Sequence, residues 1–190
     1  KHFSTFLHLS FRRQKNILNR DDQIIEFTLL FNKFKKRLYN YVLKMSADRM
    51  LTDDIVQDVF IKLYQNLDSI RNKQSIQFWL FKSARNELYT ILRNTKLKKL
   101  YSESDNYDQM EVEDTVSLAV EFDFKELNKM VMDELDKINP DQKEIFILKE
   151  YSGLSYKEIA VLMDIDEELV KSRLYKVRQK LIKRISKYVE

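Results

Sequence analysis

Between residues 76 and 93, aromatic side chains alternate with cations and an amide along one face of an expected helix. That face comprises Phe78, Trp79, Lys82, Arg85, Asn86, Tyr89 and Arg93. Aromatic rings stack with unpaired bases, which is worth roughly 1–3 kcal/mol per base, and neighbouring cations hold the phosphates of the strand. The pattern therefore predicts a surface that binds single-stranded nucleic acid. The alternative is that Phe78 and Trp79 pack against a neighbouring helix.

A polar, basic loop precedes this helix at residues 69–75. Arg71, Asn72 and Lys73 give it two cations and an amide, and we expect it to receive a base that has left its stack. The opposite side of the helix is apolar and predicts a core face, formed by Ile76, Leu80, Phe81, Ala84, Leu88, Ile91 and Leu92.

A second candidate site lies in residues 171–187, which hold eight Lys or Arg residues and no acid. The expected helix has an apolar face made by Val170, Leu174, Val177, Leu181 and Ile185. On its polar side we assign Lys171, Ser172, Tyr175 and Lys176 to base readout or its rim, and Arg173, Arg178 and Lys180 to phosphates. Glu167 and Glu168 suit a helix N-terminus but would repel a phosphate backbone. The alternative is a solvated basic helix.

Signals for helix boundaries precede the basic segment. Asn139-Pro140 predicts a helix start, and Gly153 predicts the end of that helix. Ser155 and Glu158 form a capping-box pair that starts the next helix. A turn of about three residues at 164–166 then leads into the basic helix, and two helices joined by so short a turn form a helix-turn-helix.

The helix expected from Thr52 has a core face made by Ile55, Val56, Val59, Phe60, Leu63 and Leu67. Its other side gathers an apolar side chain among acids and amides, namely Asp54, Gln57, Asp58, Ile61 and Gln65. An apolar centre with a polar rim is typical of a protein-docking patch. The alternative is a solvated face with one exposed isoleucine.

Composition narrows the class of protein. The 190 residues include one Gly, one Pro, no Cys and two His, and the formal net charge is +4. Few turn residues favour long helices over sheets, and the lack of thiols removes disulfides and thiolate metal sites. No nucleophile–base pair, phosphate loop or metal spacing is present, so we expect neither an enzyme nor a cofactor. No window is apolar enough to enter a membrane, and a cytoplasmic protein is expected.

The expected fold is all-α, with two small helical domains joined by a flexible acidic linker. Residues 1–21 form an unassigned N-terminal extension, and 22–95 form the first domain. The linker is 96–121, and within it residues 101–114 carry six acids and no basic residue. The second domain is 122–190.

These motifs resemble the extracytoplasmic-function (ECF) sigma factors of the bacterial sigma-70 family. Thr-Asp-Asp-Ile-Val-Gln-Asp-Val-Phe at 52–60 and Phe-Trp-Leu-Phe-Lys-Ser-Ala-Arg-Asn at 78–86 are similar to sigma region 2. Gly-Leu-Ser-Tyr-Lys-Glu-Ile-Ala at 153–160, followed by Val-Lys-Ser-Arg-Leu at 170–174, is similar to region 4. The resemblance covers about 22–95 and 123–188.

The resemblance implies a transcription initiation factor that binds core RNA polymerase. The patch around Asp54 and Ile61 would bind the clamp helices of the beta-prime subunit, and the beta flap is a further implied partner. The loop from Arg71 and the helix behind it would capture the melted −10 strand, and the helix from Glu167 would read the −35 duplex. A monomer is expected when the protein is free, and binding by an anti-sigma factor is left open.

Two departures from the family pattern affect the helix-turn-helix. Asp164 stands where the family usually has glycine, and Asp tolerates the left-handed conformation better than most residues. Glu167-Glu168-Leu169 replaces the usual small residues and would alter which bases are accepted. Two rival functions remain at this point: a helix-turn-helix regulator that acts without polymerase, and an adaptor protein that mimics a sigma factor.

Overall fold

The structure is a computed structural model that describes residues 2–70, 72–101 and 120–189. Every regular element in these ranges is a helix, so the expected all-α class is confirmed. The longer helices are α1 (His2–Ser46), α2 (Arg49–Asn66), α3 (Ile76–Tyr101), α4 (Val120–Asp136), α5 (Pro140–Phe146), α6 (Tyr156–Met163) and α7 (Glu167–Val189). Short turns of other helix types are η1 (Leu67–Ser69), η2 (Lys73–Ser75) and η3 (Ile147–Tyr151).

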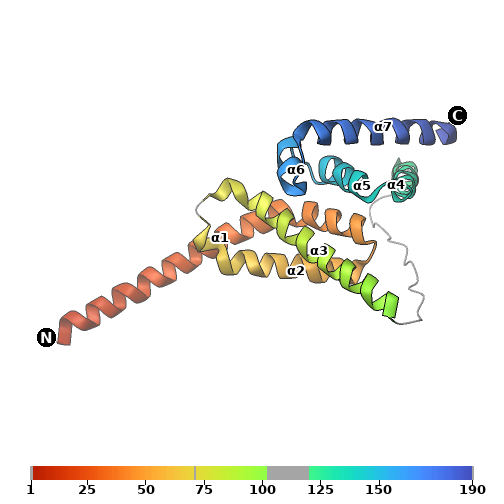
Figure 1. The fold of residues 1–190 in the computed structure, drawn as a ribbon. Helices are drawn as coiled ribbons and strands as arrows, with labels where there is room; N and C mark the ends of the chain where they lie inside the picture. Colours follow the sequence, from red (N-terminus) through yellow and green to blue (C-terminus); the bar gives the residue numbers. More distant parts are fainter. Residues whose placement is uncertain (1, 71, 102–119, 190) are drawn as a thin grey trace.

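Helices α1, α2 and α3 form the first body, a bundle in which α3 crosses the other two (Figure 1). The predicted apolar faces of α2 and α3 are confirmed. The buried apolar residues of α2 are Ile55, Val56, Val59, Phe60 and Leu63. Those of α3 are Ile76, Leu80, Phe81, Ala84 and Leu88. From α1 the core receives Phe34, Leu38, Tyr41 and Val42, at the three- and four-residue spacing of one helix face.

Helix α1 begins at His2, so residues assigned to an N-terminal extension are continuous with the helix of the first body. No Gly or Pro interrupts the sequence between residues 2 and 46, which explains why the helix does not break. It stops at Ala47, whose φ of 55° is left-handed. Asp48 then caps α2 by accepting a hydrogen bond from the Leu51 backbone N–H at 3.0 Å.

Helix α3 continues to Tyr101, beyond the residue at which we placed the start of the linker. The basic cluster at 96–99 is made of Lys and Leu, which are strong helix formers, so no local signal ends the helix there. Residues 102–119, the rest of the expected linker, lie outside the described residues.

The second body consists of α4, α5, η3, α6 and α7. The predicted start of α5 is confirmed: the Asn139 side chain accepts from the Asp141 backbone N–H at 2.9 Å, and Pro140 is the first helical residue. After Phe146 the helix widens into the π-turn η3, in which the Ser152 backbone N–H donates to the Ile147 carbonyl at 3.1 Å.

The helix-turn-helix has the predicted boundaries. The Ser155 hydroxyl accepts from the Glu158 backbone N–H at 3.2 Å, while the Glu158 carboxylate accepts from the Ser155 N–H at 2.7 Å. This capping box is therefore confirmed. Asp164 ends α6 in the left-handed conformation, with φ 55° and ψ 51°, as its position in place of glycine requires. Helix α7 begins at Glu167, directly after the turn.

The two bodies pack against each other through one continuous apolar core. Buried side chains from both bodies contribute to it, including Leu38 and Leu80 from the first and Ile145, Leu148 and Ile159 from the second. Helices α5 and α6 lie between the first body and α7 (Figure 1), and the turn η3 contacts α1. The polar face of α7 is consequently on the outer side of the molecule.

Candidate nucleic-acid interface

The aromatic side chains predicted to stack with bases lie at the edge of the core. Phe78 and Trp79 are half-buried and pack against the apolar core, so each ring presents only part of its surface. Lys82 and Asn86 are exposed beside them, and the Lys82 ammonium lies 5.6 Å from the centre of the Phe78 ring. The packing that we gave as the alternative is therefore partly realised, and it coexists with an exposed cation on the same helix.

Two other members of this face, Arg85 and Tyr89, contact the second body. Arg85 donates through Nε to Glu144 Oε1 at 2.9 Å and through Nη2 to Oε2 at 3.3 Å. The Tyr89 hydroxyl donates to Oε2 at 2.9 Å. In this arrangement the Glu144 carboxylate on α5 accepts hydrogen bonds from the cation and the phenol that we assigned to the nucleic-acid strand.

The loop before α3 is partly described. Arg71 lies outside the described residues, whereas Asn72 and Lys73 are exposed. Lys73 forms an ion pair with Glu26 of α1 at 2.7 Å, and both partners are partly open to solvent. Such a pair contributes little to stability, so it leaves Lys73 free to exchange Glu26 for another anion.

The candidate duplex reader lies on the outer side of α7. Its apolar face is confirmed, because Val170, Leu174, Val177 and Leu181 are all buried. Ser172, Tyr175 and Lys176 are exposed, and Tyr175 is 64% exposed. Leaving a large aromatic side chain in water on a basic helix is consistent with a surface that receives a partner.

Two cations assigned to DNA, Lys171 and Arg173, have acidic partners within the second body. Lys171 pairs with Glu167 at 3.2 Å and with Glu168 at 2.9 Å, which ties both acids at the start of α7 to a neighbouring cation. Arg173 lies 3.7 Å from Asp141. The partners of Lys171 reduce the repulsion that we expected from Glu167 and Glu168, since the three side chains together carry one net negative charge.

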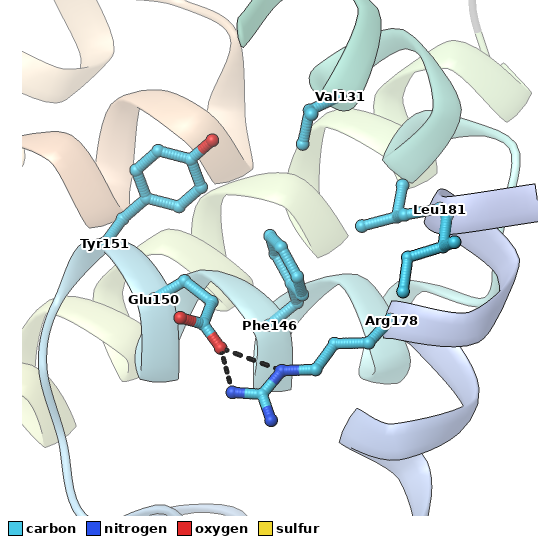
Figure 2. A pocket seen from close by; sticks show the side chains of 7 residues that line it. Val131, Phe146, Glu150, Tyr151, Arg178 and Leu181 are labelled. Carbon is cyan, nitrogen blue, oxygen red and sulfur yellow. Dashed lines mark hydrogen bonds and ion pairs between the residues drawn. The ribbon is translucent and has the colours of Figure 1, made fainter. Parts of the chain in front are cut away.

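Arg178 lies on the edge of an apolar groove of about 380 Å³ between α4, α5, η3 and α7. Figure 2 shows its guanidinium turned toward Glu150, to which Nε donates at 3.2 Å, while Phe146 and Leu181 line the groove beside it. Both partners are partly exposed. Glu150 therefore competes with a phosphate for this guanidinium.

The predicted docking patch on α2 is exposed throughout. Asp54, Gln57, Asp58 and Gln65 are accessible, and the Ile61 side chain at their centre is 46% exposed. This patch lies on the side of α2 opposite to its core face, so packing within the bundle does not require an apolar residue there.

Sequence reasoning missed the side chains that join the two bodies. Glu144 is fully buried, and so is Tyr41, whose hydroxyl donates to Glu144 Oε1 at 2.7 Å. One signal was present in the sequence: Glu144 precedes the buried Leu148 by four residues, which places an acid on an apolar helix face. Such an acid requires partners, although the sequence does not say which.

Burial governs the ionisation of the two phenols at this carboxylate. It raises the pKa of Tyr41 well above its ordinary value, and the negative charge of Glu144 raises that pKa further. The pKa of Tyr89 is raised for the same two reasons, burial first. Both phenols therefore stay protonated as donors to the carboxylate at neutral pH.

Taken together, a capped helix-turn-helix with a basic second helix and a helical bundle with an aromatic, cationic face define a DNA-binding transcription protein. Among the described residues, no helix combines the length and apolar character that crossing a membrane requires.

Comparison with known proteins agrees with this class. Sigma-70 region 2 matches residues 30–97, and Sigma-70 region 4 matches residues 128–181. The ECF RNA polymerase sigma factor SigM of Bacillus subtilis is 30% identical over 153 residues, which cover 80% of this chain and 90% of that protein. The ECF RNA polymerase sigma-E factor of Haemophilus influenzae is 28% identical over 165 residues, covering 84% and 87%.

Two solved structures share the fold. The sigma factor RpoE of Bartonella quintana, in complex with the anti-sigma factor NepR, has a TM-score of 0.69 at 23% identity and covers 85% of this chain and 97% of its own. CnrH, in complex with the cytosolic domain of CnrY, has a TM-score of 0.56 at 19% identity, covering 84% and 87%.

The chain belongs to the sigma-70 family, within its ECF group. It is a transcription initiation factor that directs RNA polymerase to promoters, and it is not an enzyme.

Proposed function

We propose that three separate surfaces of this sigma factor perform the three steps of promoter recognition. The outer side of α7 reads the −35 duplex, the face of α3 with the preceding loop captures the melted −10 strand, and the α2 patch binds core polymerase. The observation that carries the proposal is the capped helix-turn-helix: Ser155, Glu158 and Asp164 fix the two ends of α6. Helix α7 begins directly after the turn, and its first three turns expose Ser172, Tyr175 and Lys176.

For −35 reading, helix α7 carries exposed residues that have no role in packing and buried residues that hold the fold. Ser172 and Lys176 lie one turn apart on the exposed side of α7, while Val170 and Leu174 anchor the helix. In helix-turn-helix proteins the first turns of the second helix reach base edges in the major groove. Lys176→Ala should therefore weaken duplex binding, and a residue that reads a base should alter sequence preference as well.

For strand capture, Trp79 and Phe78 supply ring surface and Lys82 supplies charge. Unstacking and trapping a base costs a few kcal/mol, which stacking on an aromatic ring can offset without ATP. The matched variants are Trp79→Ala, which removes the ring, and Trp79→Phe, which keeps a smaller one.

The test is run-off transcription with purified core polymerase, combined with permanganate detection of unpaired thymines. We expect Trp79→Ala to reduce open-complex formation about tenfold or more and Trp79→Phe to retain much of it, in line with the free energy of one stacked base. If a folded Trp79→Ala protein opens promoters at the normal rate, strand capture by this face is wrong.

For polymerase binding, we propose that the α2 patch docks on the clamp helices of the beta-prime subunit, with Ile61 at its apolar centre. Ile61→Ser removes the apolar contact at an exposed position and should leave folding nearly unchanged. Pull-down with core polymerase should show at least a tenfold loss of binding. Met50→Ser, at a still more exposed apolar position of the same helix, is the control.

We further propose that the protein acts in the cytoplasm, as a monomer when free, with the beta flap as a second contact on polymerase. The two structural relatives are in complexes with an anti-sigma factor or a cytosolic partner domain, which supports testing for an anti-sigma factor here. A regulator acting without polymerase, or a sigma-mimic adaptor, would give no promoter-specific transcription in the run-off assay.

A further inference from the structure

Glu144 is a fully buried carboxylate that belongs to one body and is held by the other. It lies on α5, and its side chain is 0% exposed. Its four hydrogen bonds come from α1 and α3: Tyr41 and Arg85 Nε donate to Oε1, and Tyr89 and Arg85 Nη2 donate to Oε2. Each carboxylate oxygen thus accepts one phenol and one guanidinium N–H.

This donor set is that of an oxyanion receptor. A guanidinium that donates through two nitrogens matches the spacing of two oxygens on a carboxylate or on a phosphate. The two phenols converge on the same oxygens from α1 and α3, at 2.7 and 2.9 Å. Arg85 and Tyr89 also belong to the face proposed to capture the −10 strand, and a single strand must place its phosphates beside its stacked bases.

We propose that Tyr41, Arg85 and Tyr89 form a pocket for a backbone phosphate of the single strand, and that Glu144 fills this pocket when the two bodies are closed. The inference rests on the proposed strand capture and deepens it. It adds Tyr41 to the site, names the phosphodiester as its ligand, and makes Glu144 an internal competitor of DNA.

The closed arrangement cannot be the one that spans a promoter. Elements at −10 and −35 are separated by roughly 25 base pairs, or about 85 Å of duplex. A compact body of about 150 residues measures about 40 Å across. Because Arg85 and Glu144 are in contact, the two reading surfaces of the closed protein cannot reach both elements. The bodies must separate on the promoter, and separation withdraws Glu144 from the pocket.

Other contacts hold the bodies closed together with Glu144. Gln77 of α3 donates to Glu158 of α6 at 2.9 Å, and the Lys44 ammonium lies 4.0 Å from the centre of the Tyr151 ring. These contacts come from α1, α3, α5, α6 and η3, and α7 lies beyond α5 and α6 from the first body (Figure 1). Closure therefore fills the phosphate pocket of the strand site and leaves the duplex site open, which gives the experiment an internal reference.

The first test compares Glu144→Gln with Glu134→Gln in the full chain. Both replace a buried carboxylate of the second body by an amide, but the partners of Glu134, Lys137 and Arg184, lie within that body. The probe is a fluorescein-labelled 12-nucleotide single strand of mixed sequence, followed by anisotropy. Apparent affinity scales with the fraction of open protein, so Glu144→Gln should bind about tenfold more tightly. Glu134→Gln and binding to a mixed-sequence duplex should be unchanged.

The second test asks whether the gain comes from the phosphate pocket. Tyr41→Phe removes one hydroxyl and keeps the ring in the core. Added to Glu144→Gln, it should reverse most of the gain for the single strand, because the uncovered pocket then lacks a donor. If the double variant binds the single strand as tightly as Glu144→Gln alone, the proposed phosphate pocket is wrong. The proposal is also wrong if Glu144→Gln binds no more tightly than the native protein.

A reversible lock provides a third measurement. Since the chain has no cysteine, Lys44→Cys with Tyr151→Cys can be joined across the two bodies by a bismaleimide that contains a disulfide. The locked protein should lose single-strand binding about tenfold and keep duplex binding, and reduction of the linker should restore it. Equal single-strand binding before and after reduction would overturn the competition.

The outcomes separate this inference from strand capture itself. If Trp79→Ala weakens single-strand binding while Glu144→Gln and the lock change nothing, strand capture stands and the Glu144 pocket is wrong. If Trp79→Ala has no effect in the Glu144→Gln background, strand capture fails as well.

Discussion

Arg37 on α1 donates through Nε to the carbonyl oxygen of Ser152 at 2.7 Å, although 115 residues separate them in the sequence. A second guanidinium nitrogen, Nη2, donates to the same oxygen. The π-turn η3 precedes Ser152 and the left-handed Gly153 follows it, so this carbonyl points out of the helix and toward the first body. The contact joins the two sigma regions through a backbone atom.

Removing the hydrogen bonds from Arg37 to Ser152 should weaken the packing of the two sigma regions against each other. Arg37→Ala leaves the Ser152 carbonyl without its charged donor, and we expect the free energy of unfolding to fall by about 1–3 kcal/mol. Urea denaturation followed by circular dichroism measures the change. Arg37→Lys keeps the charge but loses the forked geometry, so its free energy of unfolding should lie between those of the native protein and Arg37→Ala. A loss below a few tenths of a kcal/mol for Arg37→Ala would contradict the role given to this contact.

Gly153 should not tolerate alanine. Its φ is +65°, and a Cβ built there would lie 3.2 Å from Arg37 Nη2. Backbone strain alone should cost about 1–2 kcal/mol, with a further loss if Arg37 must move. Thermal unfolding of Gly153→Ala in the native and Arg37→Ala backgrounds separates the two causes. If Gly153→Ala destabilises the Arg37→Ala protein less than the native protein, the difference measures the steric conflict with Arg37. If Gly153→Ala destabilises neither protein, both the backbone strain and the steric conflict are refuted.

Replacing Asp164 by glycine should stabilise the protein. Its left-handed conformation strains any residue with a Cβ, and its side chain is exposed. We expect Asp164→Gly to raise the free energy of unfolding by about 0.5–1 kcal/mol and Asp164→Val to lower it. Ala47 has the same φ of 55° at the end of α1, so Ala47→Gly is a matched variant in the first body. Destabilisation by both glycines would show that the strain is absent.

Loss of the capping box should weaken the start of α6. Ser155→Ala removes the acceptor for the Glu158 backbone N–H and should cost about 1 kcal/mol. Ser155→Thr keeps a hydroxyl and should cost much less. Hydrogen exchange of the first-turn amides of α6 is the local readout. Unchanged protection in Ser155→Ala would mean that packing of Leu154 and Ile159 alone fixes the helix start.

Alkaline pH should open the contact between the regions. The pKa values of Tyr41 and Tyr89 are raised in the folded protein, first by burial and then by the charge of Glu144. A raised pKa means that these phenols stabilise the fold fully below their ordinary value near 10 and lose that effect as pH rises through the folded value. Absorbance at 295 nm should show late-titrating phenols, fewer of them in Tyr89→Phe. Titration of all ten tyrosines near pH 10 would contradict this.

The sequence by itself determined the local features of this protein. Helix ends at Asn139-Pro140, Ser155 and Asp164 depend on side chains that bond to their own backbone within a few residues, so spacing alone reveals them. The apolar faces of α2, α3 and α7 follow the 3.6-residue period for the same local reason. The motifs on these helices were sufficient to indicate region 2 and region 4 of a sigma factor.

Only the tertiary structure decided how the two regions meet. Arg85 and Tyr89 were expected to face nucleic acid, yet they hold Glu144, which is 59 and 55 residues away in the sequence. The pairing of Arg37 with Ser152 is equally remote. No periodic pattern encodes such contacts, because they arise when two amphipathic bodies bury their remaining apolar surface together and each buried charge must then find a partner across the junction.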